Sequence, residues 1–120
     1  MALGEPTSAL AHAQQALDIG DAATMRCAEA ATLHVMAEIQ LASGESGPAV
    51  GRAEAAVALA ARTGQRLVEG RSLLTAGRGH RALGATAAAR RAWERATQVL
   101  GPLGVPEAGA AVDLLHGDGA

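Results

Sequence analysis

Residues 66–100 read RLVEGRSLLTAGRGHRALGATAAARRAWERATQVL and carry the pattern of two helices joined by a short turn. The later part places its apolar residues on one helix face, at Ala89, Ala92, Trp93, Ala96 and Leu100. The earlier part is apolar on more than one face, as in a helix that has neighbours on both sides. A glycine at position 84 separates the two parts. We therefore expect an antiparallel helix pair over residues 66–82 and 86–100.

The same pattern recurs along the chain, with each position matched by another one forty places on. Three positions of one helix match across the copies, and all are alanine except Trp93: Ala9, Ala13 and Ala16, then Ala49, Ala53 and Ala56, then Ala89, Trp93 and Ala96. The turn glycines obey the same period, at Gly4, Gly44 and Gly84 and again at Gly64 and Gly104. We expect six helices, over residues 6–19, 22–42, 47–62, 66–82, 86–100 and 106–115.

These helices predict one all-α domain over residues 1–116. It comprises a partial unit at 1–20, units at 21–62 and 63–101, a partial unit at 102–116 and a flexible tail at 117–120. Asp21 and Ser46 are the expected N-caps of the second and third helices. Good helix formers dominate the sequence, whereas strand formers do not alternate with polar residues.

Charge and cysteine content narrow the class of protein. The chain carries −5 over residues 1–51, +6 over 52–95 and −3 over 96–120, so the net charge of −2 lacks the overall positive excess of a nucleic-acid binder. A single cysteine, Cys27, cannot form an intramolecular disulfide, and no stretch has the length of apolar sequence that spans a bilayer. We expect a cytoplasmic protein that does not enter a membrane.

The last unit resembles the tetratricopeptide repeat (TPR) family. Large, small and aromatic positions of the family's first helix match Leu73, Gly77 and His80, and its second helix matches Ala89, Trp93 and Ala96. The period of 40 departs from the usual 34, and proline is missing at the end of the second helix. The resemblance implies a right-handed α-solenoid of five to six helices that binds proteins. The repeat of this chain is similar to long-period repeats in bacterial transcriptional regulators and signal-transduction ATPases. This similarity implies that the chain is a segment of such a regulator.

By the same resemblance, the first helix of each pair lines a concave surface that binds a peptide or protein partner. Its outward positions are His34, Glu38 and Leu41 in one unit and Arg71, Leu74, Arg78 and Arg81 in the next. The arginines predict an acidic partner, because guanidinium groups offer a planar fork of donors to carboxylates. The competing interpretation is a solvated face in a chain whose basic residues other than histidine are all arginine.

Other classes of function find less support in the sequence. No catalytic residue, cofactor site or metal site is expected, since phosphate-loop, G-x-S-x-G, H-E-x-x-H and zinc-ligand spacings are all lacking. Nucleic-acid binding is disfavoured because no helix-turn-helix pair with a basic recognition helix stands out. The main alternative to a peptide-binding scaffold is a structural module that forms a homodimer through its unpaired terminal helices, 6–19 and 106–115.

Three glycines, Gly70, Gly77 and Gly79, fall inside the expected helix 66–82. Each costs about 1 kcal/mol relative to alanine in a helix interior. Only Gly77 has a packing reason, since the resemblance places a small residue there. We therefore expect this helix to be the least stable.

Overall fold

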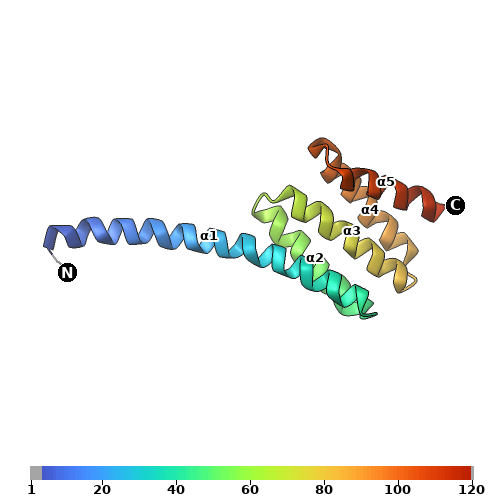
Figure 1. Cartoon of the computed structure of the whole chain (residues 1–120), viewed down its shortest axis with the longest axis horizontal. Coiled ribbons are helices and arrows are strands. Elements are labelled where there is room, and N and C mark those ends of the chain that lie inside the picture. Colours follow the sequence, from blue (N-terminus) through green and yellow to red (C-terminus); the bar gives the residue numbers. More distant parts are fainter. Residues whose placement is uncertain (1–3, 120) are drawn as a thin grey trace.

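The computed structural model describes the backbone of residues 4–119 and the side chains of residues 22–117. Within these residues the chain is all-α and contains no strand, which confirms the predicted fold class (Figure 1). There are five α-helices and one short 3-10 helix: α1 (Gly4–Ala42), α2 (Ser46–Arg62), α3 (Arg66–Ala82), α4 (Thr86–Leu100), η1 (Gly101–Leu103) and α5 (Pro106–Gly119).

Four glycines with positive φ mark the turns between these helices. They are evenly spaced along the chain, at Gly44 (84°), Gly64 (73°), Gly84 (80°) and Gly104 (65°). At the first three, the residue after the glycine donates its amide hydrogen to a carbonyl five residues back, as when Glu45 bonds Gln40 at 2.8 Å. The starts of α3 and α5, at Arg66 and Pro106, are separated by one full period of the repeat. The last helix therefore continues the repeat in register.

The break expected between residues 19 and 22 is absent, and this prediction was wrong. A single helix, α1, runs from Gly4 to Ala42. The evenly spaced series of turn glycines would next require glycine at position 24, where the chain has Thr24. Gly20 lies four residues too early for that series, and a lone glycine does not have to end a helix. Asp21 consequently lies inside α1 and not at the start of a helix.

Two smaller boundary predictions also need correction. Ser46 is the first residue of α2, and the capping position belongs to Glu45, whose side chain makes no capping hydrogen bond. The expected tail from residue 117 is helical as far as Gly119, because α5 extends to that residue.

Each helix packs against its neighbours in sequence, and α3 contacts three other α-helices (Figure 1). It lies against α2 and α4, and also touches α1, the helix one pair earlier. The N-terminal half of α1 projects away from the other helices, which gives the molecule its length of 71 Å against 30 and 18 Å in the other directions. No helix in residues 4–119 combines the length and apolarity needed to cross a membrane.

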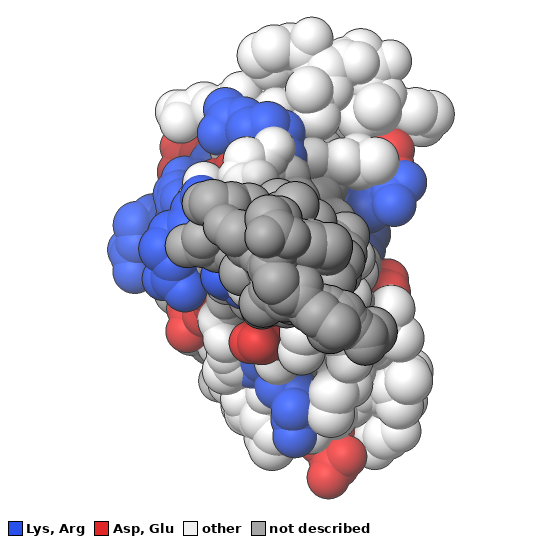
Figure 2. All heavy atoms as spheres, turned by 90° about the vertical axis from the view of Figure 1, so that its left-hand side faces the viewer, with Lys and Arg blue, Asp and Glu red and all other residues white. Residues whose placement is uncertain are grey.

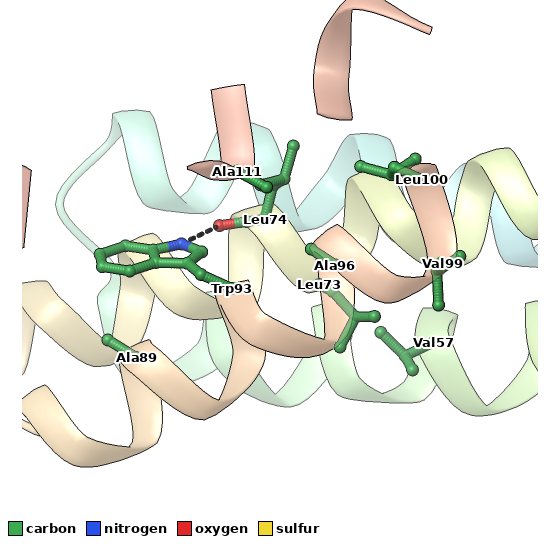
Figure 3. Packing of buried hydrophobic residues seen from close by; sticks show 9 residues of the cluster. All are labelled: Val57, Leu73, Leu74, Ala89, Trp93, Ala96, Val99, Leu100 and Ala111. Carbon is green, nitrogen blue, oxygen red and sulfur yellow. Dashed lines mark hydrogen bonds between the residues drawn. The ribbon is translucent and has the colours of Figure 1, made fainter. Parts of the chain in front are cut away.

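The largest hydrophobic cluster is centred on Trp93, which is fully buried between α3 and α4 (Figure 3). Its indole nitrogen donates a hydrogen bond to the backbone carbonyl of Leu74 at 3.4 Å, so the polar edge of the ring is satisfied. The other buried members of the cluster come from α2 to α5: Val57, Leu73, Leu74, Ala89, Ala96, Val99, Leu100 and Ala111. With so many alanines, the helices must approach closely for this core to be filled.

The three glycines of α3 are the points of closest approach. A methyl group at Gly77 would overlap the indole of Trp93, and one at Gly70 would overlap the side chain of Leu100. One at Gly79 would stand 2.6 Å from Cγ2 of Val50. Gly70 and Gly79 thus have packing reasons that the sequence did not reveal, and the glycines let α3 fit between α2 and α4.

Candidate functional site

A groove on one face brings together side chains from α1, α3 and α5, the first helix of each pair. Its volume is about 170 Å³. Five of the seven residues predicted to bind a partner line it: His34, Glu38, Arg71, Leu74 and Arg78. Thr75, Glu107 and Ala110 complete the lining. We call these eight residues the first-helix groove.

Glu107 of α5 was not anticipated, and it changes the charge of the groove. Its carboxylate forms an ion pair with Arg71 at 2.6 Å across 36 residues of sequence. The pKa of Glu107 is lowered, first by a hydrogen bond from its own backbone amide and then by the hydrogen bond from Arg71. The only available signal was the repeat register, which starts α5 at Pro106 and so places Glu107 in its first turn.

Burial disfavours a positive charge on His34 in the groove. Burial is the largest influence on it and lowers the pKa of the imidazole; Glu38 raises this pKa and Arg71 lowers it. Nε2 of His34 lies 3.3 Å from Oε1 of Glu38. Nδ1 is buried and has no hydrogen-bond partner among the described residues. The ring therefore offers one polar atom that no described group satisfies.

Arg78 is the cation left over when the charges of the groove are paired. Arg71 is held by Glu107, whereas Arg78 has no ion pair within the part of the chain whose side chains are described. The lining contains two arginines and two carboxylates, whose formal charges cancel. The groove is thus balanced overall, and not the uniformly basic surface that the arginine spacing suggested.

The remaining predicted residues lie elsewhere or face inward. Leu74 was expected to point outward, but only 4 % of it is exposed and it forms the floor of the groove. Arg81 places its guanidinium carbon 5.3 Å from the ring centroid of Trp93, in a cation–π contact. Leu41 is partly buried. Neither Arg81 nor Leu41 lines the first-helix groove.

A larger groove of about 580 Å³ lies over α3 between α2 and α4, the second helices of their pairs. Its apolar lining consists of Val57, Leu73 and small residues, namely Ala58, Ala61, Ala76, Ala88 and Ala92. Its charged lining is Glu54 and His80, which are 3.3 Å apart, together with Arg91 and Arg95. We call this the second-helix groove. Sequence reasoning missed it because alanine spacing predicts close packing and not a gap between alternate helices.

Charges of both signs are mixed on the surface. Seen from the N-terminal side of α1, acidic atoms lie among the arginines on the visible face (Figure 2). Beneath the surface, the carboxylate of buried Glu69 lies 3.2 Å from Arg66 and 4.0 Å from Arg95. Among the described residues, no group of three or more His, Cys, Asp or Glu side chains could hold a metal ion.

Comparison with known proteins finds no relative of this chain. No family model, no curated protein and no solved structure matches the chain.

Proposed function

We propose that this chain is a protein-interaction scaffold of tetratricopeptide-like type, which binds a peptide or protein segment in the first-helix groove and performs no catalysis. The supporting observation is that side chains of α1, α3 and α5, from His34 to Ala110, line one groove. A series of helices that presents alternate members on one face offers an extended surface to a partner. A longer array of this kind would extend that face.

The chemistry of the groove indicates which side chain it would receive. Its 170 Å³ is smaller than the roughly 300–1,000 Å³ of small-molecule sites, and suits a single inserted side chain. Leu74 and Ala110 supply an apolar floor, while Arg78 offers donors without a described carboxylate partner. A peptide carboxylate next to an apolar residue would satisfy both. The partner we propose therefore carries an acidic residue at its centre and does not need a uniformly acidic surface.

The setting of the scaffold is part of the same proposal. The long period of the repeat supports a place in a larger bacterial regulator of transcription or signalling, where such arrays recruit or sense a partner. We place the protein in the cytoplasm, and we expect neither a nucleic acid nor a membrane as its direct partner.

The proposal is tested with an array of short synthetic peptides in which one acidic residue is moved along an apolar background. We expect binding, measured by fluorescence anisotropy, for a subset that contains Glu or Asp beside Leu. Arg78→Gln should weaken that binding about tenfold, because a charge-assisted hydrogen bond is worth about 1.5–3 kcal/mol before solvent screening. Added salt should weaken binding to the wild type more than to the variant.

The matched control is Arg91→Gln in the second-helix groove. It should leave peptide affinity unchanged. If Arg91→Gln removes binding and Arg78→Gln does not, the peptide occupies the second-helix groove and the proposal is wrong. Absence of binding to every peptide in the array would also overturn it.

A further inference from the structure

One long face of α1 is mostly apolar, and no helix among the described residues packs over it; its one recorded side-chain contact is from Nη1 of Arg52, which lies 3.7 Å from Sδ of Met36. Its exposed residues follow helical spacing: Met25, Ala28, Thr32, Val35, Met36 and Ile39. We call them the open face. Met25 is 69 % exposed and Ile39 60 %, the two highest values among the large hydrophobic side chains that stand exposed on the described part of the chain. The opposite row of α1 differs, because its residues Ala30 and Ala37 are fully buried.

The repeat identifies what kind of element covers such a face. One period later, the corresponding positions of α3 include Val68, Ala76 and Gly79. Val68 packs with Leu59 and Ala60 of α2, Ala76 clusters with Ala53 of α2, and Gly79 adjoins Val50 of α2. The open face of α1 is therefore the surface that, in α3, is covered by the preceding second helix.

A sequence with the pattern of that missing helix is present in the chain. The row of α2 that faces α3 comprises Val50, Ala53, Val57 and Ala60. One period earlier the chain has Leu10, Ala13, Leu17 and Gly20, which are apolar or small and uncharged. These residues belong to the projecting half of α1, and a continuous helix cannot fold back onto its own other half.

We propose that the open face binds residues 10–20 of a second copy of this chain, so that two α1 helices pair antiparallel along their length. In the α2–α3 contact, Ala53 is level with Ala76, and Val50 with Gly79. The same register places Ala13 against the second copy's Met36, and Leu10 against its Ile39. This pairing is reciprocal, and its two-fold axis falls between residues 24 and 25, close to the middle of Gly4–Ala42.

The sizes of the residues that this register brings together are compatible with such a helix pair. Gly20 meets the second copy's Ala28 near the centre, where small residues let the helices come close. Leu10 and Ile39, which are larger, meet nearer the ends, so the helices cross at a shallow angle. Pairing also gives the projecting half of α1 a neighbour, and isolated helical segments of this length are marginal in water. The pairing is independent of the peptide proposal, because no open-face residue lines the first-helix groove.

The first test is light scattering after size exclusion over a wide range of concentration. We expect a dimer, and we expect Ile39→Glu to raise its dissociation constant about hundredfold, about tenfold for each of two symmetric sites. Leu83→Glu is the matched control, since Leu83 is 56 % exposed but lies outside α1. A wild type that stays monomeric at every concentration would overturn the inference. So would equal weakening by the two substitutions.

The second test locates the contact with engineered cysteines in a Cys27→Ala background. We expect a disulfide to link two different copies when Ala13→Cys protein is mixed with Met36→Cys protein. Ala13→Cys mixed with Glu38→Cys is the control, because Glu38 lines the first-helix groove, about 100° around α1 from the centre of the open face, and should give no such link. If linkage occurs only within one chain that carries both Ala13→Cys and Met36→Cys, the segment folds back on its own copy and the second-copy proposal is wrong.

Discussion

Helices α1 and α3 occupy equivalent places in the repeat, yet one has an uncovered face and the other is enclosed. At matching positions of the repeat, α1 carries Met36 and Ile39 where α3 carries Ala76 and Gly79. The small residues of α3 lie under α2, whereas the large ones of α1 are exposed. Side-chain size along one face thus records how closely the covering helix approaches.

The contacts of these helices with their following partners differ in a complementary way. Ala37 of α1 lies with Ala53 of α2, and at the matching positions of the next pair Gly77 of α3 faces Trp93 of α4. Compared with the α1–α2 pair, the α3–α4 pair has a larger side chain on its second helix and a smaller residue on its first helix. The two pairs are alternative solutions to one packing problem.

The largest expected effect comes from converting the α3–α4 contact into the α1–α2 type. Trp93→Ala should cost about 3–5 kcal/mol of unfolding free energy, because it leaves a cavity. Gly77→Ala alone should cost about 1–3 kcal/mol, through overlap with the indole. In the Trp93→Ala background, Gly77→Ala should instead stabilise by about 1 kcal/mol, since the overlap is gone and alanine favours the helix. Urea unfolding at one protein concentration measures the cycle, and additive effects would contradict it.

Hydrogen exchange should distinguish the amides of α3 from those of the projecting half of α1. We expect the amides of α3 to exchange most slowly, which reverses the expectation drawn from its glycines, because α3 is packed on several sides. In the Ile39→Glu protein, amides of residues 8–20 should exchange close to the rate of an unstructured peptide. Mass spectrometry of peptide fragments gives both values. Slow exchange of residues 8–20 in that variant would show that something other than a second copy covers them.

A smaller effect is expected from restoring the missing turn glycine. Thr24→Gly supplies glycine at the next position of the evenly spaced series and costs the α1 helix several tenths of a kcal/mol. We expect it to favour a hairpin of residues 6–42 within one copy, and so to raise the monomer fraction in light scattering. Arg26→Gly is the control, because it costs at least as much helix propensity without completing the series, and Arg26 is exposed but not part of the open face. An equal rise in monomer for both variants would refute a turn at position 24.

The smallest effect concerns pH. Burial lowers the pKa of folded His34 below its ordinary value of 6.5. As pH falls through about 6.5, the unfolded chain takes up the proton first, so the folded state loses stability until the lower folded pKa is passed. Thermal unfolding between pH 8 and pH 5 should therefore show a flatter decline for His34→Gln than for the wild type. Identical slopes for the two proteins would contradict a contribution of His34 to the decline.

The repeat and its turns could be predicted from the sequence, because a glycine with positive φ leaves a local and periodic trace. Five residues of the first-helix groove could be predicted as well, since helical spacing and the period of the repeat together define a face. The continuity of α1 could have been predicted by asking for a glycine at position 24. It was missed because Gly20 and Asp21 resemble a helix boundary when they are considered alone.

The other features of the fold and of the grooves depend on distances between segments that are far apart in sequence. The ion pair of Arg71 with Glu107 and the overlap that forbids a side chain at Gly70 each require knowing how α3 meets α5 or α4. The second-helix groove is also a property of three helices together, since α2 and α4 are both in contact with α3 but leave space between them. Composition and periodicity carry no such distances.

The even spacing of the turn glycines has a consequence for how such a protein can grow. Because the turns at Gly44 and Gly84 occupy the same point of the repeating cycle, a tandem duplication of residues 43–82 would preserve every turn and every helix face. The duplicated gene would encode a stack one pair longer, with α1 and α5 still at its ends. Length could therefore change in a single genetic event while both terminal surfaces stayed the same.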